Sequence, residues 1–249
     1  MWDADIGDEG VRAMMQFMLE TECESVKLLE FLNCGITSLG CEFIGRMLDP
    51  NTKVCLEILN LDYNQFGNEG LGELLIGLKS NKNLTYLSLA YCKIEADGMT
   101  YFKEYLSDPE CTLTTLVLQG NEIGNKGVSE LSQMLVNNNS IESLNLNNVQ
   151  FGNNEETINN LVSLMMTNVN IYEYKLKYNL ITSDGKIAFN LDFEKILKAY
   201  KGESCKHVYE LEVDERIPKV LFDDYIKAKK SHKKPKKKPA KKGKKGKKK

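Results

Sequence analysis

The sequence predicts an α/β solenoid, a curved stack of about six repeats with a parallel sheet on the inside and helices on the outside. One observation is a repeat of 28 to 30 residues, in which apolar residues occupy the first, fourth and sixth positions. The other is a helical pattern later in each repeat, as in Leu71, Leu74, Leu75 and Leu78. One such unit cannot bury its own core, so the units must stack in register.

Each unit is expected to begin with a short strand. The first, fourth and sixth residues are Val26/Leu29/Phe31, Leu56/Leu59/Leu61, Leu84/Leu87/Leu89, Leu113/Leu116/Leu118, Ile141/Leu144/Leu146 and Ile171/Tyr174/Leu176. Five residues further on comes another apolar residue, and four beyond that a glycine, which together mark the turn and the start of the helix. The fifth unit has Glu155 in place of this glycine.

The ninth residue of each unit lies where the chain turns out of the strand. These residues are Cys34, Asn64, Cys92, Asn121, Val149 and Asn179. An Asn or Cys side chain there can hydrogen-bond the backbone of neighbouring turns. Val149 and Glu155 make the fifth unit degenerate, either through simple loss or as a specialised bend.

The alternation of Cys and Asn units, with Asp49-Pro50 and Asp108-Pro109 before new strands, resembles the ribonuclease-inhibitor class of leucine-rich repeats. This class includes the repeat domains of NOD-like receptors and of the Ran GTPase-activating protein. The resemblance covers roughly residues 1 to 190 and implies a leucine-rich-repeat solenoid. It says little about function, because function depends on sites added to a fold.

The two ends of the stack need caps. Ile6 and Gly10 align with Phe66 and Gly70, so the chain begins inside a partial repeat whose helix, near residues 8 to 20, caps the first unit.

After the sixth unit the repeat pattern is taken to stop. A closing helix is expected over 186 to 200, followed by an extended piece at 208 to 213 and a helix from about Pro218. The expected division is a solenoid over 1–190, a C-terminal cap over 191–228 and a disordered lysine-rich tail over 229–249.

Catalytic chemistry has little support. The chain has only two histidines, His207 and His232, and neither a phosphate-binding nor a dinucleotide-binding fingerprint. We therefore expect no catalytic residues, no metal and no cofactor. The seven cysteines follow no paired spacing and are interpreted as reduced, mostly buried thiols. Without a membrane span or a signal peptide, the expected location is the cytoplasm, possibly in association with the cytoskeleton, with the nucleus as the alternative.

The concave face is the expected binding surface. In this kind of solenoid the second, third, fifth and seventh residues of each unit face that side, and Tyr63, Tyr91 and Tyr178 follow just beyond. The partner-binding candidates are Asp62, Tyr63, Tyr86, Tyr91, Gln119, Asn147, Lys175 and Tyr178. Tyrosine combines contact area with a polar tip, so the cluster of Tyr63, Tyr86 and Tyr91 beside Asp62 is the preferred site. The alternative is that all of these are ordinary solvated strand residues.

Charge is divided unevenly along the chain. Of 33 Lys and Arg residues, 15 are lysines within 227–249, which leaves 18 against 35 Asp and Glu, or −17, in the rest. The tail could be an inert extension, an import signal or a binder of polyanions such as nucleic acid, tubulin tails or anionic membranes. The polyanion-binding candidates are Lys233, Lys234, Lys236, Lys237, Lys238, Lys241, Lys242, Lys244 and Lys245.

The sequence thus favours a non-enzymatic scaffold that binds a protein partner on the concave face and an anionic polymer through its tail. The chain is expected to be monomeric or part of a larger assembly. One alternative is a GTPase regulator of the type of the Ran GTPase-activating protein, although that family has more repeats and an acidic C-terminal segment. Inhibition of a ribonuclease ranks last, because six repeats form too short an arc to surround such an enzyme.

Overall fold

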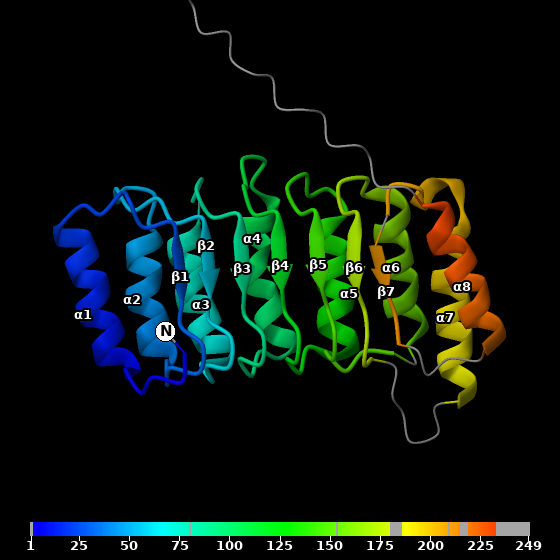
Figure 1. Ribbon diagram of the computed structural model, residues 1–249, viewed down its shortest axis with the longest axis horizontal. Coiled ribbons are helices and arrows are strands. Elements are labelled where there is room, and N and C mark those ends of the chain that lie inside the picture. Colours follow the sequence, from blue (N-terminus) through cyan, green and yellow to red (C-terminus); the bar gives the residue numbers. More distant parts are fainter. Residues whose placement is uncertain are drawn as a thin grey trace, which may run out of the picture.

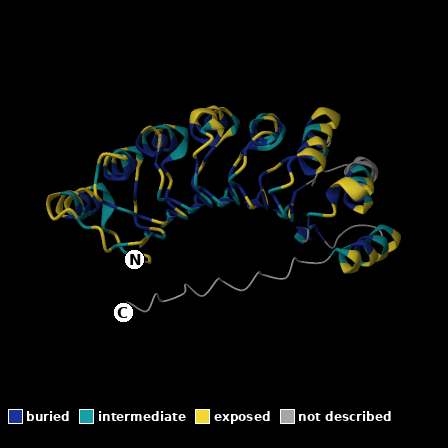
Figure 2. Cartoon of the chain, turned by 90° about the horizontal axis from the view of Figure 1, so that it is seen from above, coloured by how far each residue is buried: buried dark blue, intermediate teal, exposed yellow. Residues whose placement is uncertain are grey.

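The computed structural model describes residues 2–79, 81–152, 154–179, 186–208, 210–214 and 219–232. For residues 186–193 only the backbone is described. The chain forms one row of strands backed by one row of helices (Figure 1). Viewed from above, this row bends into an arc with the strands on the inner side and the most exposed residues on the outer helices (Figure 2). The predicted α/β leucine-rich-repeat solenoid is confirmed.

The inner sheet consists of short parallel strands in sequence order. They are β1 (Leu28–Glu30), β2 (Ile58–Asn60), β3 (Tyr86–Ser88), β4 (Thr115–Val117), β5 (Ser143–Asn145), β6 (Glu173–Lys175) and β7 (Glu210–Glu212). The register pairs the fourth position of each unit with the fourth position of the next, as in Leu59 with Leu87 and Leu87 with Leu116. The apolar side chains are therefore aligned along the whole stack.

Helices cover the outer side of the sheet (Figure 1). They are α1 (Gly7–Glu20), α2 (Ser38–Leu48), α3 (Gly67–Leu78), α4 (Phe102–Ser107), α5 (Gly124–Leu135), α6 (Glu155–Thr167), α7 (Lys186–Lys201) and α8 (Lys219–Ser231). Two 3₁₀ helices, η1 (Ala96–Tyr101) and η2 (Glu203–Cys205), complete the row. The third unit thus has a 3₁₀ helix leading into a short α-helix where a single α-helix was expected. The capping helix expected near residues 8 to 20 is α1.

The core lies between the sheet and the helices. Leu59, Leu87 and Leu116 are fully buried, and the apolar side of α3, typified by Leu71 and Leu74, packs against them. Helices α2 and α3 approach so closely that a Cβ atom on Gly77 would lie 1.9 Å from the carbonyl oxygen of Gly45. A glycine is required at this contact.

The expectation that the repeat pattern stops after six units is wrong. The extended piece near residue 208 contains β7, which pairs in parallel with β6 and extends the sheet. Val208, Leu211 and Val213 are buried with the first, fourth and sixth spacing of the earlier units. This seventh unit was missed because it begins 37 residues after Ile171, well beyond the usual period.

The C-terminal helices close the stack. Helix α7 runs across residue 190, where the solenoid was expected to end, and α8 packs beside it. The buried Tyr225 of α8 donates a hydrogen bond from its hydroxyl to the carbonyl oxygen of Leu211, which ties α8 to β7. The chain after residue 232, including the nine candidate tail lysines, lies outside the described residues.

Candidate protein-binding surface

Buried asparagines shape the turns that follow the strands. The side-chain oxygen of Asn121 accepts hydrogen bonds from the backbone N–H groups of Cys92 (2.9 Å) and Ile94 (3.0 Å). Its amide nitrogen donates to the carbonyl oxygens of Leu89 (2.7 Å) and Leu118 (2.8 Å). Asn64 and Asn179 make equivalent bonds. The predicted role of the ninth position is confirmed.

The residues at the ninth position form a ladder along the stack, called here the asparagine ladder after the members that make most of its hydrogen bonds. The bonding pattern of this ladder explains why Val149 is tolerated. Each asparagine serves the turn of the unit before it, so the N–H group of Val149 donates to Asn179 Oδ1 at 2.7 Å, just as that of Cys34 donates to Asn64 Oδ1. In the alternation of Cys and Asn at the ninth position, Val149 stands where a Cys would be expected. It lacks a thiol such as that of Cys92, which lies 3.3 Å from the carbonyl oxygen of Leu61.

At position eight of the units, directly before the ladder residue, the backbone adopts a left-handed conformation. Position eight has a positive φ in each of the first six units, with Asp3 at the equivalent place in the partial repeat: Asp3 (49°), Asn33 (50°), Tyr63 (64°), Tyr91 (57°), Gly120 (74°), Asn148 (52°) and Tyr178 (62°). Gly, Asn and Asp adopt this conformation readily, whereas tyrosine is strained there by about 1–2 kcal/mol. The tyrosines therefore occupy positions that local conformational preference does not favour.

Tyr63 and Tyr91 form a stacked pair at the edge of the sheet. Their ring centroids are 4.8 Å apart and their planes differ by 5°. This distance equals the spacing between neighbouring strands, so the rings lie side by side because their units are adjacent. A Cβ atom on Gly120 would come within 2.3 Å of Tyr91 Cε1, so the glycine in the next unit makes room for the ring. The side chain of Tyr63 is half exposed.

Two open cavities meet at this tyrosine pair. One, of about 380 Å³, lies on the concave face and is lined by six of the eight predicted residues: Asp62, Tyr63, Tyr86, Tyr91, Gln119 and Lys175. The other, of about 560 Å³, lies along the edge formed by positions seven, eight and ten, and is called here the rim cavity. Tyr63 and Tyr91 line both. Trp2, Asp3 and Gly120 of the rim cavity are absent from the predicted set.

Asp62 is partly buried at the concave cavity, and its carboxylate is engaged by hydrogen bonds within the protein. Its Oδ1 accepts hydrogen bonds from Ser88 Oγ (2.6 Å) and from the backbone N–H of Ala90 (2.7 Å). Burial raises the pKa of the Asp62 carboxyl, and these hydrogen bonds oppose that rise. The carboxylate therefore holds the end of β3 and the residues directly after it, which lead to Tyr91.

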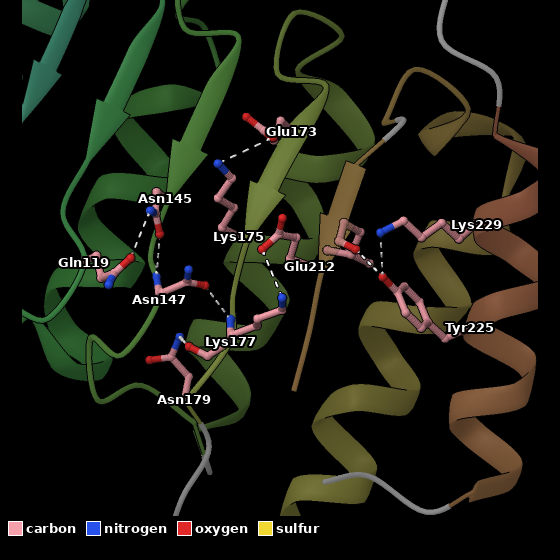
Figure 3. A network of polar contacts seen from close by, with 11 residues as sticks. Gln119, Asn145, Asn147, Glu173, Lys175, Lys177, Asn179, Glu212, Tyr225 and Lys229 are labelled. Atoms are coloured by element: carbon pink, nitrogen blue, oxygen red, sulfur yellow. Dashed lines mark hydrogen bonds and ion pairs between the residues drawn. The ribbon is translucent and has the colours of Figure 1, made fainter. Parts of the chain in front are cut away.

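The other predicted residues extend into a polar network on the strands (Figure 3). Asn147 is buried, and its Oδ1 accepts from the backbone N–H of Lys177 at 2.7 Å, so this side chain joins neighbouring units. Asn145 Nδ2 donates to Gln119 Oε1 at 3.3 Å. Lys175 Nζ forms an ion pair with Glu173 Oε1 at 3.6 Å. Tyr178 is 56% exposed and lines neither of the two cavities.

The described part of the chain offers little for other chemistry. Within it, His, Cys, Asp and Glu side chains form no group of three or more that could hold a metal ion. All seven cysteines are free thiols, and five of them are buried. Among the same residues, helices that combine the length and apolar character of a membrane span do not occur.

Comparisons with known proteins agree with this geometry. Three segments, residues 52–75, 80–103 and 111–132, match the family described as "Leucine Rich repeat". The ribonuclease inhibitor of Sus scrofa is 32% identical over 133 residues, which cover 53% of this chain and 28% of that protein. The ribonuclease inhibitor of Mus musculus is 28% identical over 183 residues, which cover 73% of this chain and 39% of that protein. The Mus musculus protein named "NACHT, LRR and PYD domains-containing protein 9C" is 32% identical over 149 residues, which cover 59% of this chain and 14% of that protein.

The chain therefore spans less than two fifths of each of these relatives. A solved structure, the tropomodulin C-terminal domain of Caenorhabditis elegans, aligns with 89% of this chain and 92% of that one. Its sequence identity is 11% and the TM-score is 0.41, so it adds nothing about function.

Proposed function

Because the repeats of this chain are leucine-rich repeats of the ribonuclease-inhibitor type, we propose that the protein is a non-enzymatic scaffold that binds a protein partner at Tyr63 and Tyr91. The observation that carries the proposal is the stacked, half-open tyrosine pair between the two cavities. Two large amphipathic rings are kept there at positive φ. Strain of this kind persists where the surrounding structure or a function requires it.

The pair suits an interface because it is already ordered. Each ring holds the other in place, so little side-chain entropy is lost when a partner covers them. Tyrosines that a partner can cover and desolvate on binding are typical of interface hot spots. Tyr86, which lines the concave cavity beside the pair, extends the same surface.

The test compares three tyrosine variants. Proximity labelling in the source cell identifies the partner, and its affinity is then measured for Tyr63→Ala, Tyr91→Ala and Tyr178→Ala. Tyr178 is the matched control, because it occupies the same repeat position at positive φ but lines neither cavity. We expect each of the first two changes to weaken binding by at least about 1 kcal/mol and the control to have no effect. Unchanged affinity for both would move the site to another surface.

The lysine tail forms a second part of the proposal. Its 15 lysines within 23 residues support nonspecific contact with a polyanion, and the −17 body competes for the tail at low salt. Full-length protein, a version ending at His232, which keeps α8 whole, and the isolated tail are titrated against duplex DNA, microtubules and anionic vesicles across a salt series. We expect the isolated tail to bind most tightly and the shortened protein hardly at all. Equal binding by the shortened and full-length proteins would leave the tail without this role.

We also propose a cytoplasmic location in association with the cytoskeleton, since buried free thiols suit a reducing compartment. Imaging of a fluorescently tagged full-length chain tests this. Accumulation in the nucleus would instead favour the import signal.

A further inference from the structure

The rim cavity has a recognisable chemical character. Its lining includes Trp2, Asp3, Asn33, Tyr63, Tyr91 and Glu122, which come from the partial repeat and the first four units. The cavity therefore runs across the strands, past one aromatic residue of the N-terminal segment and two from the stacked pair. Two carboxylates and one ammonium group, that of Lys93, give this lining a net negative charge.

The spacing of the units leaves a flat slot beside Tyr63. The backbone N–H of Asp3 donates to the carbonyl oxygen of Leu32, and that of Asn33 donates to the carbonyl oxygen of Asp62, so these units are adjacent. At about 4.8 Å per strand, Asn33 lies one step before Tyr63 and Asp3 lies two steps before it. The short side chain of Asn33 does not continue the row of rings. A planar group placed above Asn33 would extend the Tyr63–Tyr91 stack at the same spacing.

The carboxylate of Asp3 stands at the far end of this slot. Asn33 Nδ2 donates to Asp3 Oδ1 at 2.7 Å, which orients the carboxylate beside the cavity. A carboxylate has about four acceptor positions, so it can take further hydrogen bonds from a ligand. The slot thus combines an aromatic face with an oriented negative charge.

We propose that the rim cavity receives an arginine side chain of the protein partner, with its guanidinium group stacked on Tyr63 and hydrogen-bonded to Asp3. Guanidinium is planar, permanently charged and suited both to stacking on rings and to forked bonds with carboxylates. Lysine has the charge without the plane, and a nucleic-acid base would bring phosphates towards Asp3, Glu122 and an acidic body. This inference rests on the proposed function and specifies what the partner must present.

The single tryptophan makes the proposal directly measurable. Trp2 lines the rim cavity and is the only tryptophan in the chain, so its fluorescence reports on this site alone. The probes are three capped pentapeptides of glycine with a central arginine, lysine or citrulline, titrated at constant ionic strength. Citrulline keeps the planar shape and loses the charge.

We expect a saturable change of fluorescence with the arginine peptide, binding at least about fivefold weaker with lysine, and no saturation with citrulline. Asp3→Asn and Tyr63→Ala should each weaken arginine binding about fivefold or more, whereas Tyr178→Ala should leave it unchanged. Circular dichroism checks that each variant is folded. Asp3→Asn preserves the size of the side chain and provides a test that does not depend on removing a ring.

Equal binding of the three peptides, or unchanged arginine binding in Asp3→Asn, would overturn the arginine assignment. If Tyr63→Ala still weakens the natural partner in that case, the proposed scaffold function stands and only the ligand chemistry is wrong. If arginine binds selectively but no tyrosine change affects the partner, the slot exists and the proposed interface is wrong.

Discussion

Replacing Asn121 with alanine should destabilise the protein far more than replacing the neighbouring ladder residue Cys92. Asn121 is fully buried, and its side chain bonds four backbone groups in two successive turns. The change to alanine leaves the N–H groups of Cys92 and Ile94 without this acceptor. Two buried carbonyl oxygens also lose a donor.

The magnitude follows from these four groups. A buried N–H without an acceptor costs about 1–3 kcal/mol, and a carbonyl oxygen that loses one donor costs less because it has a second lone pair. We therefore expect Asn121→Ala to lower the free energy of unfolding by about 3–5 kcal/mol. Cys92→Ala removes a thiol that lies 3.3 Å from the carbonyl oxygen of Leu61, and leaves the N–H groups bonded to Asn121. Its expected loss is about 1–2 kcal/mol.

Urea unfolding measures both variants. Circular dichroism follows the helices throughout, while the fluorescence of Trp2 follows the N-terminal end, so coincident curves justify two-state fitting. A loss below about 2 kcal/mol for Asn121→Ala, or equal losses for the two variants, would refute the idea that the asparagine ladder carries the turns.

Three further outcomes concern the core, the cap and the tyrosine row, and a fourth concerns activity. Leu116→Ala should cost about 2–5 kcal/mol in urea unfolding, with no effect of chelator or reductant. Burial lowers the pKa of His207 in the folded protein below the unfolded pKa of about 6.5. The contribution of His207 to stability is therefore complete above the unfolded pKa and is lost as the pH falls through the folded pKa. The midpoint of thermal unfolding should accordingly depend less on pH, between pH 7 and 5, in His207→Gln than in the unchanged protein. Tyr178→Asn should stabilise the protein by about 0.5–1 kcal/mol, because it introduces the residue type of Asn33 and Asn148 at the same positive φ. In single-turnover assays the protein should not accelerate GTP hydrolysis by Ran-type GTPases, and a stimulation of about a thousandfold would contradict this.

The repeat itself was predictable because burial and register impose strict positions. The first, fourth and sixth residues must face the core in every unit, so Leu59, Leu87 and Leu116 repeat visibly in the sequence. An asparagine at the ninth position is constrained in the same way, as by the four backbone hydrogen bonds of Asn121. The seventh unit obeys the same rule but follows a longer connection, so a search limited to 28 to 30 residues passes over it.

A second set of asparagines was not predicted. Asn81, Asn138 and Asn168 lie three residues before the first position of the next unit and donate from Nδ2 to the carbonyl oxygens of Leu48, Leu106 and Leu135, at 2.6–2.8 Å. Cys205 occupies the same place before β7, with its Sγ 3.3 Å from the carbonyl oxygen of Met165. The fourth unit has Glu110 at this position. Because different residues serve these turns, the pattern is visible only in three dimensions.

The arrangement of residues at the proposed binding surface was predictable in part for a related reason. Tyr63, Tyr86 and Tyr91 could be chosen because they stand beside strands in known register, and the structure brings them to one place. The hydrogen bonds that hold Asp62 and Asn147 depend on which neighbouring backbone groups lack partners, so residue type alone did not reveal them.

In the proposed function, position nine has a structural role and position eight carries the binding residues. Position nine is buried and satisfies backbone groups, so its identity follows from hydrogen bonding. Position eight has a positive φ in each of the first six units, which favours the Asn and Gly found in half of them. The conformation is the same whether the side chain is Asp, Asn, Gly or Tyr, so the turn does not depend on the residue type at this position. A tyrosine can therefore be carried there at a cost of about 1–2 kcal/mol without altering the turn. The solenoid thus tolerates aromatic side chains at position eight, and adjacent units at Tyr63 and Tyr91 combine them into a surface that neither unit could form alone.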